Sequence, residues 1–400
     1  IGFFANGNYS YDDRYFADVS VRIDGSSKFG ADKKYAPFWS AGAGWNVHNE
    51  KFFKHTKISM LKLRYSYGVT GNQEFSAYQA KTMFQFNTDR LYNSGISAAL
   101  MGYGNPDLEW QNQYQSNYGF DFGYAKDRIR LQFNYYQKKT EGMLTSVSVA
   151  PSLGLPSNTF TSNLGKIQNK GVEVNLNAVL IRDQGKDFEW SVMLQAAHNK
   201  NKIMEISTAL KNINEKNNQD KTTPAAVYEE GESMSAIKAV PSLGIDPTTG
   251  QELFMKKDGT ITYTLDATDK VICGDSEPKV FGNVGTNLYW KGWNLNMVFK
   301  YDLGADYYNS TLAERVEGAN PRYNADRRVL NNRWKEPGQH ALYKNIKEYT
   351  TTYISSRFVQ KENTLQLTSL SLSYDLNREW IRKFGLNTMW LSFYMNDVFR

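Results

Sequence analysis

Metal or acid–base chemistry would first be sought among the four histidines, which are His48, His55, His198 and His340. His48 and His55 lie on either side of Glu50, but their spacing matches neither an HExxH helix nor a tetrahedral metal cluster. A position beside a turn explains this pair better than a metal site. The sequence contains no nucleophile elbow, phosphate-binding loop or dinucleotide fingerprint, so neither an enzyme nor a cofactor is predicted.

Carboxylates and the single cysteine give a similarly weak chemical signal. Residues 246–250 (Asp-Pro-Thr-Thr-Gly) and 257–260 (Lys-Asp-Gly-Thr) are rich in oxygen atoms but lack the alternating carboxylates of an EF-hand. Turns are expected there, and calcium binding is left open. Glu229 and Glu230 fall in a polar loop with nothing nearby to raise a carboxyl pKa. Cys273 cannot form a disulfide within the chain and is predicted to be incidental.

Aromatic residues in the longer predicted loops are the candidate ligand contacts, because flat rings can stack on sugar rings. The same rings could equally pack one loop against another. The candidates are Tyr103, Trp110, Phe160, Tyr307, Tyr308, Tyr323 and Trp334.

The composition limits which elements can position these residues. Aromatic residues make up 14% of the 400 residues, yet the mean hydropathy is −0.59. No run of 18 apolar residues exists, which excludes a helical membrane span. A strand of a membrane barrel alternates lipid-facing and lumen-facing residues, so its average looks polar. The formal charge of +6 is modest and its basic residues are scattered, so no nucleic-acid partner is predicted.

Alternation of apolar and polar residues is the main structural signal. It is clearest in residues 61–67, 118–124, 130–135, 172–180 and 293–302. Successive side chains of a strand point to opposite faces, so each segment has one apolar and one polar wall. We expect Leu131, Phe133, Tyr135, Leu176, Leu295, Met297 and Phe299 on the apolar wall.

About twelve such segments are predicted. Tight turns join some of them, at residues 12–13, 126–127, 183–186 and 291–292, whereas 49–58 and 377–386 are intermediate links with room for a helical turn. Long connections join the others, at residues 25–37, 71–110, 142–167, 204–278 and 304–362. The segments are 1–12, 14–24, 38–48, 59–70, 111–125, 128–141, 168–181, 188–203, 279–290, 292–303, 363–376 and 387–399.

Short and long connections alternate strictly along the chain. A soluble β-sandwich, such as a secreted lectin, has no reason to sort its loops onto two ends. An outer-membrane barrel has short periplasmic turns and long extracellular loops. Tryptophans also gather near predicted strand ends, where the membrane–water interface favours them. The predicted fold class is therefore all-β, a transmembrane antiparallel β-barrel that meets outer-membrane lipid.

Nine stretches resemble the SusC/RagA family of TonB-dependent outer-membrane transporters, and they follow the family order across nearly all of the chain. The chain departs from the family pattern in one place. Residues 361–366 stand where family members usually have an arginine-containing segment that leads into the next strand. The stretches are 22–30, 61–72, 105–110, 119–122, 135–140, 163–173, 244–250, 274–279 and 367–374.

The resemblance implies a 22-stranded barrel preceded by a plug domain, with this chain supplying strands ten to twenty-one. The chain opens and ends within predicted strands, so residues 1–400 are expected to be the C-terminal part of a single barrel, without the plug. The location implied is the outer membrane of a Gram-negative bacterium.

The resemblance also implies a function and partners. A SusD-like surface lipoprotein would close over the extracellular loops, and TonB–ExbB–ExbD would act on the plug to drive import of an oligosaccharide or peptide. A dimer of transporter–lipoprotein pairs is a further possibility. Loops 204–278 and 304–362 are predicted to carry much of the lipoprotein interface. The alternatives are a siderophore-type receptor and a passive porin, both without a lipoprotein lid.

Overall fold

The computed structural model describes residues 1–26, 34–53, 57–72, 81–93, 95–102, 104, 110–148, 159–163, 165–222, 227–320, 322–323, 326–347, 351–376 and 378–399.

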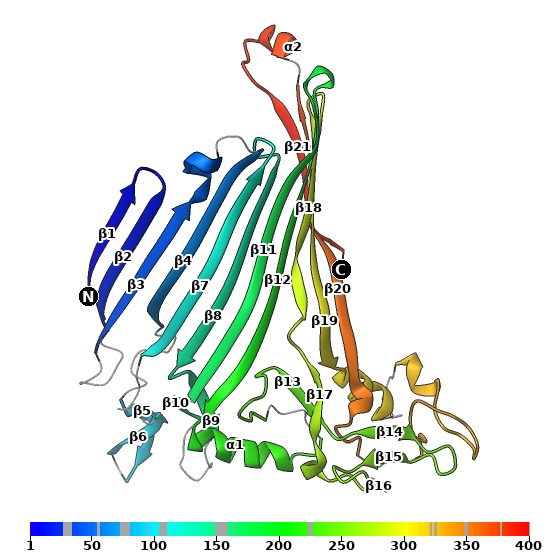
Figure 1. Ribbon diagram of the computed structural model, residues 1–400. Coiled ribbons are helices and arrows are strands. Elements are labelled where there is room, and N and C mark those ends of the chain that lie inside the picture. Colours follow the sequence, from blue (N-terminus) through cyan, green and yellow to red (C-terminus); the bar gives the residue numbers. More distant parts are fainter. Residues whose placement is uncertain are drawn as a thin grey trace. The chain divides into compact units, whose positions relative to one another are not determined.

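Twelve strands form one antiparallel sheet, in which every strand pairs with the next strand of the sheet along the chain (Figure 1). This confirms the predicted succession of hairpins. The strands are β1 (Gly2–Tyr11), β2 (Tyr15–Gly25), β3 (Tyr35–Asn46), β4 (Ile58–Asn72), β7 (Gln111–Tyr124), β8 (Ile129–Glu141), β11 (Gly165–Asp183), β12 (Phe188–Ile206), β18 (Val280–Trp290), β19 (Trp293–Tyr308), β20 (Val359–Asp375) and β21 (Trp390–Phe399).

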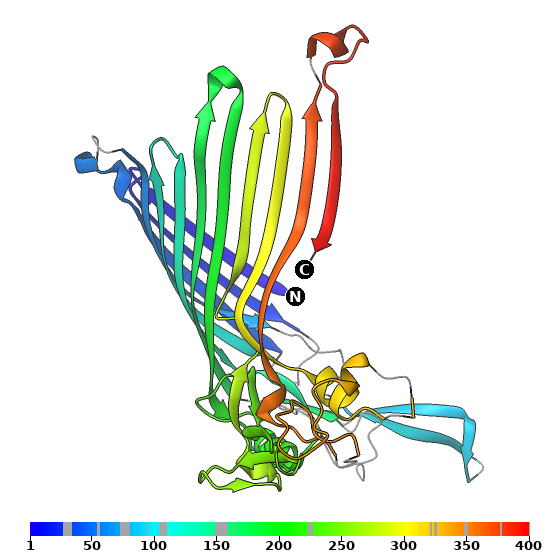
Figure 2. The ribbon, with the colours of Figure 1, turned by 90° about the vertical axis from the view of Figure 1, so that its right-hand side faces the viewer.

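One end of the sheet carries only short links, as Figure 2 shows. Asp12, Asp13, Lys126 and Asp127 have positive φ angles of 52–64°, the conformation that tight hairpin turns need. Asp183 caps the 3₁₀ turn Gln184–Lys186 by accepting hydrogen bonds from two backbone N–H groups.

Both intermediate links contain the helical turns that the sequence allowed. The link from β3 to β4 has 3₁₀ turns at Val47–Asn49 and Lys51–Phe53. The link from β20 to β21 contains helix α2, Arg378–Arg382.

The long connections have secondary structure of their own. Small antiparallel sheets pair β5 with β6, β9 with β10 and β13 with β17, and join β14, β15 and β16. The elements are β5 (Met83–Tyr92), β6 (Gly95–Gly102), β9 (Leu144–Ser148), β10 (Thr159–Asn163), α1 (Thr208–Gln219), β13 (Ala236–Ala239), β14 (Ser242–Ile245), β15 (Glu252–Met255), β16 (Ile261–Thr262), β17 (Val271–Asp275), a π-helical turn (Leu312–Glu317), and 3₁₀ turns at Ala267–Asp269, Arg327–Leu330 and Ser356–Phe358.

Some predicted boundaries were wrong. β11 begins at Gly165, β19 extends to Tyr308 and β20 begins at Val359, so the connections predicted at 142–167 and 304–362 are shorter. A strand can continue beyond the segment in which apolar and polar residues alternate, because its backbone still pairs where both faces are polar. The alternation pattern does not mark that part of the strand.

The chain divides into two compact units. The sheet unit comprises residues 1–205, 280–303 and 364–400, and the connection unit comprises 206–279 and 304–363. The connection unit thus unites the two longest predicted loops. The assignment of all 400 residues to one barrel domain stays a prediction. Among the described residues, no helix has the length and apolar character that a membrane crossing requires.

Candidate functional sites on the sheet and in the connection unit

The sheet has one apolar face whose side chains match across strands. Leu131 pairs with Leu176, Phe133 with Val174, and Leu295 with Leu288. The Phe120 and Phe133 rings stack 5.2 Å apart. The predicted apolar set therefore lies on one wall, together with Tyr65, Tyr118 and Tyr135, whose rings form a row. These three tyrosines are 36–51% exposed, as expected of a face that no other part of the protein covers.

The opposite face is polar, and Arg64 and Asp121 form an ion pair on it. Arg64 Nη2 donates to Asp121 Oδ1 at 2.7 Å and to Asn134 Oδ1 at 3.1 Å. The guanidinium lies over Gly119, where a Cβ atom would come within 3.0 Å of it and within 2.7 Å of the Asn134 amide oxygen. Glycine at this position therefore lets Arg64 lie along the wall.

Amide and hydroxyl groups dominate the rest of this face. Tyr136 donates its hydroxyl to Asn199 Oδ1 at 2.9 Å, and Asn199 donates to Asn169. Asn283 donates to Gln195 at 3.0 Å. Such a wall offers neutral donors and acceptors to a hydrated polar ligand.

A cavity of about 570 Å³ at the short-turn end of the sheet includes three arginines in its lining. Arg128 donates to the carbonyl groups of Val179 and Leu180, Arg130 pairs with Asp127, and Arg182 pairs with Glu189. All three guanidinium groups are therefore engaged within the protein.

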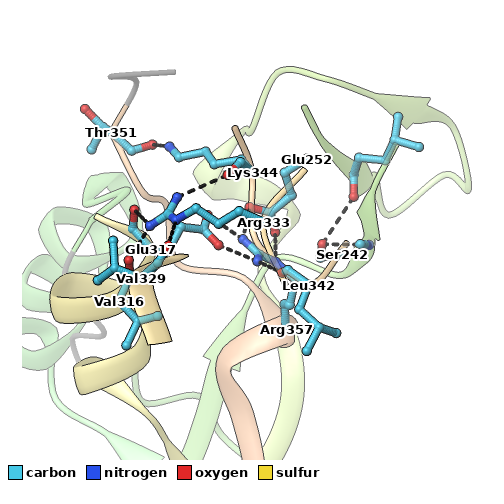
Figure 3. A network of polar contacts seen from close by, with 12 residues as sticks. Ser242, Glu252, Val316, Glu317, Val329, Arg333, Leu342, Lys344, Thr351 and Arg357 are labelled. Atoms are coloured by element: carbon cyan, nitrogen blue, oxygen red, sulfur yellow. Dashed lines mark hydrogen bonds and ion pairs between the residues drawn. The ribbon is translucent and has the colours of Figure 1, made fainter. Parts of the chain in front are cut away.

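The connection unit is held together by a buried ion cluster (Figure 3). Arg357 Nη2 lies 2.9 Å from Glu252 Oε2 and 2.6 Å from Glu317 Oε1. The side chains of Arg357, Glu252 and Glu317 are 13%, 7% and 0% exposed. Burial alone would lower the pKa of Arg357, but the two carboxylates raise it overall. Glu252 belongs to one connection and Glu317 to the other, so Arg357 joins the two.

Arg333 is buried beside this cluster and donates only to backbone carbonyl groups (Figure 3). Its acceptors are the carbonyl oxygens of Val316, Glu317, Val329 and Lys344. Two of these lie at the C-terminal end of the π-helical turn, where unpaired carbonyl groups favour a cation. Burial lowers the pKa of Arg333, although a guanidinium stays protonated in proteins.

Trp334 also joins the two connections. Its indole Nε1 donates to the Pro247 carbonyl at 2.8 Å. Gly250 has a φ of +75°, and a Cβ there would come within 2.5 Å of the Trp334 ring. The ring therefore packs against the turn at 246–250, as the loop-packing alternative predicted.

The two oxygen-rich stretches form turns. Asp246 accepts hydrogen bonds from the Thr248 backbone, the Thr249 hydroxyl and the Tyr263 hydroxyl. These bonds lower the pKa of Asp246 to about 2, with the Tyr263 bond contributing most. Asp258 accepts from the Thr260 backbone N–H. Across the described ranges, no three His, Cys, Asp or Glu side chains are grouped closely enough to hold a metal ion.

Glu50 has structural partners. It accepts hydrogen bonds from the Tyr15 hydroxyl at 2.8 Å, the Trp45 indole at 3.1 Å and Arg14 at 3.3 Å. The bonds from Tyr15 and Trp45 are the main reason that its pKa lies below the ordinary value. His48 Nδ1 lies 3.1 Å from the Leu61 carbonyl oxygen, and His55 falls outside the described residues.

The other candidate aromatics do not converge on one site. Trp110 is 7% exposed and packs edge-to-face on Phe38, inside a small apolar cluster. Phe160 lies on β10, opposite Val147. Tyr103 falls outside the described residues.

Tyr307 and Tyr308 lie on the end of β19, which corrects their assignment to a loop. The Tyr307 hydroxyl donates to Gln360 at 3.0 Å, while Tyr308 packs on Phe358 and burial raises the pKa of its phenol. Tyr323 is 76% exposed and is the most accessible candidate whose side chain is described. Ligand contact by these residues stays a prediction.

Sequence reasoning missed a second cavity, which lies within the connection unit. It has a volume of about 200 Å³ and is lined by Tyr263, Tyr353, Gln251 and Lys344 among others. It is smaller than the roughly 300–1,000 Å³ of typical small-molecule sites. No local pattern could have indicated it, because its walls come from two connections far apart in the sequence.

The comparisons with known proteins decide the family. The family model described as "TonB dependent receptor-like, beta-barrel" matches residues 1–388. The chain belongs to this family of TonB-dependent receptor barrels. It is therefore part of an outer-membrane β-barrel.

Curated relatives agree with this assignment. TonB-dependent receptor P39 of Formosa agariphila is 25% identical over 99% of the chain and 42% of its own length. TonB-dependent receptor SusC of Bacteroides thetaiotaomicron is 24% identical over 95% of the chain and 38% of its own length. The resemblance to the SusC/RagA family is confirmed. The chain spans about two fifths of the length of these relatives.

Solved structures agree on the fold. The RagAB peptide transporter matches the whole chain with a TM-score of 0.86 at 23% identity, and the match covers 43% of that chain. The closed-closed state of the RagAB peptide importer matches with a TM-score of 0.85.

Proposed function

We propose that this chain is part of a transporter that imports a large polar nutrient, an oligosaccharide or a peptide, with energy supplied through TonB and with a SusD-like lipoprotein as partner. The observation that carries the proposal is the connection unit, in which the two longest connections of the barrel are joined into one body. Structureless loops of this length are uncommon, and long ordered ones usually have a binding role.

Two further observations support the proposal. The polar face of the sheet offers amide and hydroxyl groups, which suit a hydrated ligand. The relatives include SusC, and one solved structure of similar fold is named as a peptide transporter.

The connection unit also exposes an apolar strand face. Met255 and Ile261 pair across β15 and β16, whereas Phe254, the residue before Met255 on β15, is 3% exposed. Leu243, Met255, Ile261 and Tyr263 are 54%, 36%, 57% and 47% exposed. Clustered apolar side chains on a surface favour a protein partner, and we assign this face to the lipoprotein.

Point variants test this assignment better than loop removal. Shortening residues 204–278 to a tight turn would also leave Arg357 and Glu317 without Glu252, and so would disturb the other connection. Met255→Glu with Ile261→Glu should leave the transporter folded but reduce the lipoprotein that co-purifies with it. Leu330→Glu, at a position 69% exposed in the same unit, is the matched control. Full retention of the lipoprotein by the double variant would refute the assignment.

A further inference from the structure

On the apolar face of the sheet, β11 and β12 each carry one uninterrupted run of apolar side chains. The runs are Val172, Val174, Leu176, Ala178 and Leu180 on β11, and Phe188, Trp190, Val192, Leu194 and Ala196 on β12. A strand that crosses a membrane needs about 9–11 residues. The runs extend over residues 172–180 and 188–196, so each is about as long as one crossing.

Aromatic side chains border these runs at both ends. Toward the short turns, Phe188 pairs with Trp290, and Trp290 pairs with Trp293. Toward the long connections, Val172 pairs with Tyr135, whose ring belongs to the tyrosine row. Aromatic girdles flank the apolar band of outer-membrane barrels on both sides. Residues that follow Val172 toward the long connections therefore lie just beyond one girdle.

Lysines occupy the positions directly beyond the runs on this face. On β11 the next residue of the same face is Lys170, and on β12 the next ones are His198, Lys200 and Lys202. All four side chains are exposed. We refer to Lys170, Lys200 and Lys202 as the lysine patch.

The lysine patch lies on two neighbouring strands at nearly one height (Figure 1). On the opposite face, Asn199 donates to Asn169 at 3.2 Å, so the residues that follow them, Lys200 and Lys170, are also close in height. Gln137 of β8 pairs with Lys170 and adds an amide to the same face. Neighbouring strands lie about 4.8 Å apart, and residues two apart on one strand lie roughly 7 Å apart. The three ammonium groups can therefore act on one anionic ligand.

The nearby carboxylates are paired with other lysines. Glu141 Oε1 lies 2.7 Å from Lys139 Nζ, and Glu205 Oε2 lies 2.7 Å from Lys166 Nζ. Within the part of the chain that the structure describes, no ion pair joins the lysine patch to an acid. Like charges on neighbouring strands repel, so an anionic ligand would stabilise this face.

Nearby strands carry other residue types at the corresponding positions. Beyond the apolar residues of the same face, β7 has Ser116 and Tyr114, and β19 has Tyr301 and Leu303. The cluster of lysines is thus a local feature of β11 and β12 and is not a general property of the barrel rim.

We propose that the lysine patch binds phosphate groups of lipopolysaccharide in the outer leaflet of the membrane and so fixes the depth of β11 and β12. In outer-membrane barrels the apolar band lies in the hydrocarbon layer and the long loops are extracellular, so side chains beyond the band at this end meet outer-leaflet headgroups. The headgroup of lipopolysaccharide is a phosphorylated sugar, and lysine is a common phosphate ligand. The proposal rests on the family assignment and is independent of the transported nutrient.

Titrating the whole transporter with lipid A, the phosphorylated anchor of lipopolysaccharide, tests the chemistry. The variant Lys170→Gln with Lys200→Gln removes two charges and keeps both side chains polar. Lys138→Gln with Lys300→Gln is the matched control, because these lysines pair with Asn169 and Asn283 on the polar face. In native mass spectrometry we expect the first variant to bind bisphosphorylated lipid A about fivefold more weakly for each lysine removed, and the control to bind as the wild type does. Equal affinities of the two variants would overturn the proposal.

Two further measurements separate phosphate recognition from other causes. The wild type should bind lipid A that lacks both phosphates as weakly as the first variant does, and this comparison needs no substitution. Lys170→Arg with Lys200→Arg keeps both charges and should bind bisphosphorylated lipid A as the wild type does. Wild-type affinity that is the same with and without phosphates would refute the proposal. Loss of the co-purifying lipoprotein from the glutamine variant, with lipid A binding unchanged, would show instead that the lysine patch contacts protein.

Discussion

At the residue scale, neighbouring residues of β8 and β19 lie on opposite faces of the sheet and so in two different surroundings. Phe133 and Met297 belong to the apolar wall, whereas Gln132 and Asn296 point to the polar face. A charge on the lipid side loses its hydration, while a charge on the polar side keeps it.

We therefore expect Phe133→Arg and Met297→Arg each to cost about 2–4 kcal/mol of folding free energy near the bilayer midplane. Gln132→Arg and Asn296→Arg should cost little. Denaturant titrations of barrel folding into lipid vesicles would measure the difference. Equal costs on the two faces would contradict the assignment of the apolar wall to lipid.

A second residue-scale prediction concerns acid. The pKa of Asp246 is about 2, below its ordinary value of 3.8. Ionised Asp246 therefore stabilises its turn fully above roughly pH 4, and this contribution is lost as the pH falls through 2. Hydrogen exchange of residues 246–263 should be faster in Asp246→Asn than in the wild type at pH 5.

The same comparison supplies its own check. Intrinsic exchange rates change with pH equally in both proteins, so only the difference between them reports on the carboxylate. That difference should shrink as the pH approaches 2. A difference that stays constant down to pH 2 would mean that the charge on Asp246 does not hold the turn.

At the scale of elements, Arg357 connects β15 to the π-helical turn. Arg357→Ala leaves two buried carboxylates without their cation, which typically costs about 3–5 kcal/mol. The matched control is Arg328→Ala, because Arg328 pairs with Asp326 at the surface, and such pairs contribute about 0–1 kcal/mol. Limited proteolysis of the connection unit across a denaturant series would rank the variants.

Replacing all three residues of the cluster tests whether the loss of stability comes from unpaired charge or from packing. With Arg357→Met, Glu252→Gln and Glu317→Gln combined, no unpaired charge remains, so much of the stability should return. If the triple variant is as unstable as Arg357→Ala, packing at this site matters more than charge.

At the scale of the whole molecule, the two units should not unfold together. The strands of the sheet unit are fixed by one continuous hydrogen-bonded ladder, whereas the connection unit depends on small sheets and one ion cluster. Chains with separate compact units commonly depart from two-state unfolding.

We expect heating to cause two transitions, with the connection unit unfolding first. Protease cleavage within residues 206–279 and 304–363 should begin at a temperature where the barrel still migrates as a folded species in gel electrophoresis. Arg357→Ala should move only the lower transition. A single transition that shifts as a whole in this variant would show that the units are coupled.

The sequence by itself determined the sheet. Residues such as Leu131, Phe133 and Tyr135 alternate with a period of two, and this local pattern specifies both the strand and its apolar face. Residue types at the tight turns, such as Asp12 and Asp13, indicated where the chain reverses its direction between strands. The order of short and long connections then indicated a membrane barrel.

Only the tertiary structure decided how the long connections fold. Arg357 and Glu252 are 105 residues apart, and Trp334 and Pro247 are 87 apart, so no local pattern links them. For the same reason Trp110, predicted as a ligand contact, was found buried against Phe38. Alternation follows from the geometry of one strand, whereas these contacts depend on which distant segments meet.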